Sequence, residues 1–154
     1  MKGKIKFLGD ILICLGVGAF CGLFFNILIM KSPLPAMFPA YSDELAGKLY
    51  SVDTVTGVFL FGLAVPVIEE LIFRIGLYGF LYRKMGFRAA ALISSLVFGI
   101  YHMNVVQCVY AFCMGVILCV LYRRDNRVFV PICVHMGANL AVWLLGNTIA
   151  GWIG

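Results

Sequence analysis

The stretch PVIEELIFRIGL, residues 66–77, places three charged side chains in an otherwise apolar segment. Glu69 and Glu70 are adjacent, and Arg74 follows one helical turn later. A charged side chain at the centre of a bilayer costs at least about 2.5–3.5 kcal/mol on insertion scales. Three such charges facing lipid would cost on the order of 8–10 kcal/mol. We therefore expect them to face one another or a water-filled cavity.

Helical geometry separates the two carboxylates. Glu70 and Arg74 lie four residues apart on one helix face, so we expect them to form an ion pair. Glu69 is rotated about 100° from Glu70 and has no partner on its own helix. The expected arrangement is a structural Glu70–Arg74 pair beside a freer Glu69 carboxylate. The alternative is that all three residues form only a packing network.

Two further stretches, FGIYH (98–102) and HMGAN (135–139), contribute His102, His135 and Asn139. His135 and Asn139 are four residues apart and share a helix face, and Gly137 between them predicts a close backbone approach. A carboxylate such as Glu69 beside a histidine can activate water as a general base. A second histidine and an amide can donate hydrogen bonds to a developing oxyanion. This set of residue types predicts hydrolysis of an acyl bond.

The sequence does not favour a serine or cysteine nucleophile. The G-x-S-x-G motif is absent, and Ser94 and Ser95 precede His102 by about two helical turns. Cys133 is two residues from His135 and therefore points to a different helix face. Water activated by a carboxylate is the better interpretation of the polar residues.

The composition predicts an integral membrane protein. The 154-residue chain is 63% hydrophobic and 12% charged, whereas soluble domains are about 45–50% apolar and about 25% charged. The mean hydropathy is +1.03. The net charge of +5 comes from basic residues clustered at the ends of apolar runs, as the positive-inside rule expects. It does not indicate binding to nucleic acid.

Five apolar runs approach the length of about 20 residues that a spanning helix needs. Since backbone polar groups in lipid must be paired within the segment, we expect an all-α, polytopic membrane helix bundle of about five transmembrane helices. Pro66 favours a bend in the second run, beside Glu69. The expected spans are residues 7–30, 52–83, 88–104, 106–122 and 128–150.

The basic clusters alternate along the chain, which predicts a cytoplasmic N-terminus and an outside C-terminus. Counted at about 1.5 Å per residue from the basic ends, Glu69, His102 and Asn139 lie about 18–22 Å deep. His135 comes out at about 12 Å. These depths fall in the middle part of a hydrocarbon core about 30 Å thick. Residues from the second, third and fifth spans can therefore meet.

The polar residues also carry a resemblance to a known family. The motifs EELIFR (69–74), FGIYH (98–102) and HMGAN (135–139) occur in order on separate spans. This pattern of E-E-x-x-x-R, F-x-x-x-H and H-x-x-x-N resembles the CPBP family, the CAAX prenyl-protease and bacteriocin-processing (Abi) membrane proteases. The resemblance covers about residues 52–145, the protease motif core of a single integral membrane domain, residues 1–154.

The resemblance implies an intramembrane endopeptidase that cleaves a peptide bond in a membrane-associated peptide or protein, lipidated or not. Glu69 would be the catalytic base, with His102 helping to hold and activate the water. His135 and Asn139 would stabilise the oxyanion, and no cofactor would be needed. The expected setting is a bacterial plasma membrane. A chain this short is expected either to be active alone or to complete its cavity by forming a homo-oligomer. The supporting residues would be Glu70 and Arg74.

Three alternatives stay open. The first is a zinc metalloprotease with Glu69, His102 and His135, together with Glu70, as ligands, although H-E-x-x-H is absent and Arg74 would occupy Glu70. The second is a non-catalytic bacteriocin-immunity or scaffold protein, in which the polar cluster binds a partner. The third is a small proton-coupled transporter, which would also use membrane carboxylates and histidines but lacks an obvious inverted repeat.

Overall fold

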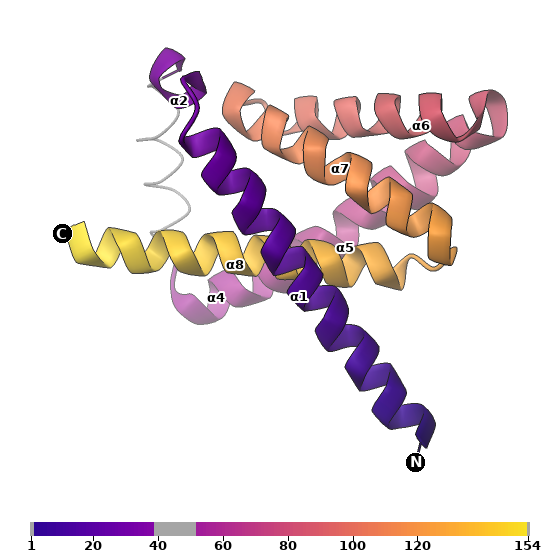
Figure 1. Cartoon of the computed structure of the whole chain (residues 1–154), viewed down its shortest axis with the longest axis horizontal. Coiled ribbons are helices and arrows are strands. Elements are labelled where there is room, and N and C mark those ends of the chain that lie inside the picture. The colour runs from indigo at the N-terminus through magenta and orange to yellow at the C-terminus, as the bar shows by residue number, and fades with distance from the viewer. Residues whose placement is uncertain (1, 39–51, 154) are drawn as a thin grey trace.

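The computed structural model of the protein describes residues 2–38 and 52–153. All regular structure within these ranges is helical (Figure 1). The segments η1 and η2 are π-helical, with wider turns than an α-helix. The elements are α1 (Lys2–Met30), α2 (Leu34–Met37), α4 (Thr54–Phe59), η1 (Leu60–Ala64), α5 (Val65–Glu70), η2 (Leu71–Tyr78), α6 (Gly79–Tyr101), α7 (Val105–Asp125) and α8 (Phe129–Ile153).

The helices confirm the expected membrane bundle. Among the described residues, three helical stretches are long and apolar enough to cross a bilayer: Leu8–Met30, Thr54–Tyr101 and Val105–Asp125. A shorter apolar helix follows at Phe129–Leu145. The second stretch has 48 residues. It reverses direction at Gly86 and therefore forms two consecutive helical segments. The chain is an all-α integral membrane protein with helices at the five predicted places.

The reversal at Gly86 is tighter than the sequence suggested. The basic residues around it predicted a connection from about residue 84 to 87, but the helix continues to Gly86 and resumes directly after it. Gly86 has φ 75° and ψ −178°, a region that is accessible essentially to glycine alone. One residue without a Cβ is therefore enough to turn the chain back.

Wide helical turns flank the short α5 segment that carries both glutamates. Pro66 is buried and has no backbone N–H to donate, which removes one helical hydrogen bond. The residue before it, Val65, donates its N–H to the carbonyl of Leu60, five residues back. The π-helical turn thus accommodates the proline within a continuous helix. Turns of this kind occur frequently at functional sites, and here they precede and follow Glu69 and Glu70.

Small residues let α1 cross α8 at close range, as Figure 1 shows. A Cβ built on Gly22 of α1 would lie 2.8 Å from the Cα of Ala138. A Cβ on Gly137 of α8 would fall against the backbone of Leu15. This confirms the close approach predicted for Gly137, and it follows the general use of small residues between membrane helices. The crossing fixes the part of α8 that carries His135.

The helices alternate between two ends of the molecule. In Figure 1 the N-terminus and the α7–α8 connection lie on the right, whereas the α6–α7 connection and the C-terminus lie on the left.

Polar side chains cap the first turns of two helices. Asn104 caps α7 by accepting a hydrogen bond from the Gln107 N–H at 3.1 Å. Asp53 caps α4, and its hydrogen bonds from the Thr56 side chain and backbone hold the pKa of the carboxyl below its usual range.

Candidate active site

Four charged or titratable side chains meet inside the bundle. Three of them come from the continuous α5–η2 segment and the fourth comes from α8. Glu70 of α5 and Arg74 of η2 form the predicted ion pair, with 2.9 Å between Arg74 Nε and Glu70 Oε2 and both side chains 0% exposed. His135 of α8 joins them, because its Nδ1 donates to Glu70 Oε1 at 2.9 Å. Glu70 therefore holds two helices together through one carboxylate.

Arg74 is less well satisfied than its short ion pair suggests. Its Nε–H does not point along a hydrogen bond to Glu70, and neither terminal nitrogen has a hydrogen-bond partner among the described residues. The guanidinium instead lies over the ring of Phe98, with 5.0 Å from its carbon to the ring centre. Buried guanidinium donors are costly when unpaired.

Glu69 faces the other nitrogen of the same histidine. His135 Nε2 lies 3.5 Å from Glu69 Oε2, slightly longer than a direct hydrogen bond. Two carboxylates and one guanidinium leave one unbalanced negative charge in a buried place. One extra proton on either Glu69 or His135 makes the cluster neutral, which burial strongly favours. A proton on His135 Nε2 would face Glu69 Oε2 across the 3.5 Å between them.

His102 stands at the C-terminal end of the helix Gly79–Tyr101. Its Nδ1 donates to the Phe98 carbonyl at 2.8 Å, and since a carbonyl can only accept, this bond places the proton on Nδ1. The other nitrogen, Nε2, then carries a lone pair in the neutral ring. No hydrogen bond or ion pair joins His102 to Glu69 in the described parts of the chain.

The Phe98 ring separates the two histidines and organises the site. Its centre lies 5.0 Å from the His102 ring and 5.7 Å from the His135 ring. It also meets Phe73 edge-on at 4.9 Å, and its side chain is 1% exposed. In the sequence, Phe98 stands out only as the first position of the FGIYH motif. Its spacing of four residues from His102 was the signal for this contact.

The remaining candidates take different places. Asn139 is half-buried one turn after His135, and no hydrogen bond to it is found within the described residues. Ser94 lies against Cys119, with 3.4 Å between Oγ and Sγ, rather than against a histidine. The structure therefore brings Glu69, Glu70, Arg74 and His135 together, with His102 one ring away.

The arrangement does not form a preorganised metal site. No group of three His, Cys, Asp or Glu side chains in the described residues could hold one metal ion. Glu70 and His135 Nδ1 are already engaged with each other, and Glu70 also pairs with Arg74. Glu70 is therefore not a free ligand for zinc, which takes three or four protein ligands.

Comparison with known proteins identifies the family of this site. Residues 51–141 match the family model described as "Type II CAAX prenyl endopeptidase Rce1-like". The chain belongs to this Rce1-like family. The matched region contains Glu69, Glu70, Arg74, His102 and His135, and Asn139 lies near its end.

Two bacterial relatives are similar over part of the chain. One, from Bacillus subtilis (strain 168), is named "Putative membrane peptidase YdiL" and is 40% identical over 80 residues, covering 52% of this chain and 33% of the relative. The other, "Membrane-embedded CAAX protease MroQ" from Staphylococcus aureus (strain USA300), is 32% identical over 100 residues, covering 60% of this chain and 40% of the relative. The chain thus matches less than half the length of either relative. No solved structure matches it significantly.

Proposed function

We propose that this Rce1-like protein is an intramembrane endopeptidase in which Glu69 activates a water molecule. The observation that carries the proposal is the buried cluster in which His135 lies between Glu69 and Glu70. Such a cluster is expensive to bury in a membrane protein and is suited to proton transfer. It also lies in the segment that matches a family of endopeptidases.

The protonation state sets the roles in the proposed reaction. With the shared proton on His135, the Glu69 carboxylate is a free base and His135 Nε2 is a donor. Water would lie between Glu69 and His102 Nε2, whose lone pair is left open by the bond from Nδ1 to Phe98. The water oxygen attacks the peptide carbonyl carbon while Glu69 takes the water proton. That proton then passes to the departing amine, and the C–N bond breaks.

The oxyanion formed by this attack would need hydrogen-bond donors beside the base. His135 Nε2 lies 3.5 Å from Glu69 Oε2, so its N–H would reach an oxygen attached to the attacked carbon. The amide of Asn139, one helical turn further along α8, is the proposed second donor. Glu70 and Arg74 would hold His135 in place by fixing its Nδ1.

The proposed substrate is a membrane-associated peptide or protein. This follows from the position of the cluster in a membrane helix bundle and from the printed names of the family and of MroQ, which refer to CAAX proteases. A prenylated C-terminal tail and an unmodified membrane peptide are the two substrate classes to compare. We further propose a cytoplasmic N-terminus, on the basis of the alternating basic clusters.

The proposal is tested with the purified full chain in lipid nanodiscs. Farnesylated CAAX peptides and matched unprenylated membrane peptides are supplied as a mixture, and cleavage is followed by mass spectrometry. His102→Ala should abolish cleavage, and Asn139→Ala should lower the rate by about 10²–10³-fold, as removal of one oxyanion donor does. The control is Asp10→Asn, which changes an exposed carboxylate of α1. Full cleavage by both site variants would overturn the proposal.

A chelator arm separates the metal-free mechanism from its zinc alternative. We expect dialysis against a chelator to leave the rate unchanged, since no group of three His, Cys, Asp or Glu side chains in the described residues could hold one metal ion and Glu70 is paired with Arg74 and His135. Loss of activity that zinc restores would instead assign Glu69, His102 and His135 to a metal site. Wild-type protein that cleaves neither peptide class, while Glu69→Gln retains the same bound partners, would favour the scaffold alternative.

A further inference from the structure

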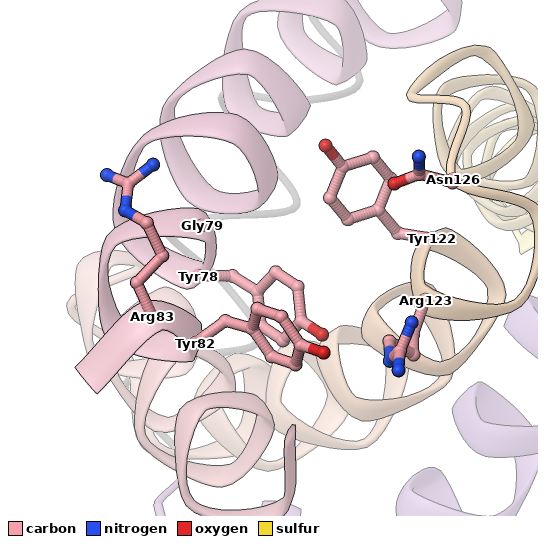
Figure 2. Close-up of a pocket in the computed structure, with 7 residues that line it drawn as sticks. All are labelled: Tyr78, Gly79, Tyr82, Arg83, Tyr122, Arg123 and Asn126. Carbon is pink, nitrogen blue, oxygen red and sulfur yellow. The ribbon is translucent and has the colours of Figure 1, made fainter. Parts of the chain in front are cut away.

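A small cavity lies apart from the Glu69–His135 cluster, between the η2–α6 region and the end of α7 (Figure 2). Its volume is about 190 Å³. Drug-sized ligands occupy pockets of about 300–1,000 Å³, so this one suits a small headgroup or ion. The residues that matter for its chemistry are Tyr78, Tyr82, Arg83, Tyr122, Arg123 and Asn126.

The cavity offers hydrogen-bond donors and positive charge. Two arginines line it, and no carboxylate is found among its described lining residues. Figure 2 shows the hydroxyls of Tyr78 and Tyr82 pointing the same way, toward Arg123. The Tyr78 side chain is 3% exposed, and its buried hydroxyl has no hydrogen-bond partner among the described residues. A buried unpaired hydroxyl needs an explanation, and a bound acceptor supplies one.

Aromatic contacts hold these donors in place. The rings of Tyr78 and Tyr82 are stacked, with 5.8 Å between their centres. Tyr122 meets Tyr78 edge-on at 5.9 Å. The guanidinium of Arg123 lies over the Tyr82 ring at 5.2 Å. The walls from both helices are therefore fixed before any ligand arrives, which lowers the entropy lost on binding.

The position of the cavity indicates which acceptor it meets. Arg83 and Arg123 belong to the basic clusters at the ends of two apolar helical segments. Tyrosine is enriched where membrane helices meet the lipid headgroups. Guanidinium forks match the oxygens of a phosphate, and basic pockets between membrane helices bind lipid phosphates. We propose that this cavity binds a phosphate group at the membrane surface, supplied by the headgroup of an anionic lipid.

The phosphate oxygens would accept from the Tyr78 hydroxyl and from Arg123, and Arg83 would add positive charge at the edge of the cavity. The site is separate from the glutamate cluster and does not depend on peptidase activity. Lipid binding there would hold η2 against α7, at the end of the same helix that carries Arg74.

The test uses the full chain, delipidated in a neutral detergent. Phosphatidylglycerol and phosphatidylcholine are titrated separately, and lipid retention is measured by native mass spectrometry together with the melting temperature. We expect retention of phosphatidylglycerol but not of phosphatidylcholine. Arg123→Gln should weaken phosphatidylglycerol binding about tenfold or more, as loss of a charge-assisted hydrogen bond does. The matched control is Arg124→Gln, which removes the same charge from the neighbouring exposed position outside the cavity.

Tyr78→Phe removes one hydroxyl and keeps the ring stack. In the lipid-free protein its melting temperature should equal or exceed that of wild type, because the hydroxyl is buried and unpaired. The stabilisation by phosphatidylglycerol should shrink. A purely structural role for Tyr78 would give the reverse pattern and would contradict the proposal.

A third arm replaces lipid with inorganic phosphate. Inorganic phosphate could stabilise wild type but not Arg123→Gln while phosphatidylglycerol is retained no better than phosphatidylcholine. In that case the cavity is a phosphate site, but its ligand is soluble rather than a lipid. Equal losses of phosphatidylglycerol binding in Arg123→Gln and Arg124→Gln would overturn the site, since only general surface charge would then matter. No response of wild type to either phosphatidylglycerol or phosphate would overturn it as well.

Discussion

Replacing Arg74 by methionine tests the buried ion pair that anchors the cluster. Arg74 and Glu70 are both 0% exposed, and their charged atoms lie 2.9 Å apart. In Arg74→Met the Glu70 carboxylate would stay buried with only the His135 hydrogen bond. The variant also loses the stacking of the guanidinium on the Phe98 ring. Methionine fills much of the same volume, so the change is mainly one of charge.

The expected loss follows from these contacts. Removing one partner of a buried pair costs about 3–5 kcal/mol, because the other charge is left uncompensated. Because Glu70 keeps its hydrogen bond from His135, we expect a loss at the lower end of this range, about 3 kcal/mol. Such a loss lowers the folded-to-unfolded ratio by more than a hundredfold. For a chain of this size such a loss corresponds to a fall of about 6–12 °C in melting temperature.

A double-mutant cycle measures the pairing itself. Glu70→Gln in the Arg74→Met background removes the stranded charge but keeps an acceptor for His135. The double variant should therefore be more stable than Arg74→Met alone, with a coupling energy of about 2–3 kcal/mol. Melting in detergent micelles is the assay, and Arg124→Met, at an exposed position of α7, is the control. A melting temperature of Arg74→Met equal to that of wild type, or simple additivity in the cycle, would refute the reasoning.

Three further substitutions probe the packing around the site. Phe98→Ala should cost about 3–5 kcal/mol and abolish cleavage, because that ring separates the two histidines, whereas Phe20→Ala, at a side chain 71% exposed, should change melting little. Gly86→Ala should cost about 1–3 kcal/mol from backbone strain alone, since a Cβ there meets nothing within 4 Å, and Gly16→Ala in α1 should be neutral or stabilising in the same melting assay. Gly22→Leu should force α1 away from α8 and lower both melting temperature and cleavage; unchanged values would show that the crossing does not support the site.

The positions of the helices followed from hydrophobic length, because lipid allows no alternative to helical pairing. The single-residue reversal at Gly86 could not be predicted in this way, since arginine and lysine mark only where a helix leaves the membrane. The π-helical turns were also missed. Pro66 signalled an irregularity, but the widened turn at Leu71–Tyr78 has no proline within it.

The pairing of Glu70 with Arg74 was predictable because it lies within one helix, where spacing fixes distance. The link from His135 to both glutamates joins residues 65 or more positions apart. It depends on how α8 is rotated about its own axis, which the sequence does not fix. Depth counting placed His102 and Glu69 at one level but gave no rotation. It therefore could not indicate that Phe98 would separate the two histidines.

The most direct test of the account measures cleavage in water enriched in oxygen-18. Wild type should produce a fragment whose new C-terminal carboxylate contains one heavy oxygen, as hydrolysis requires. Glu69→Gln keeps the size of the side chain but cannot take a proton from water, so it should remain folded and form no labelled product. Labelled product from Glu69→Gln at the wild-type rate would contradict the assignment of Glu69 as the base.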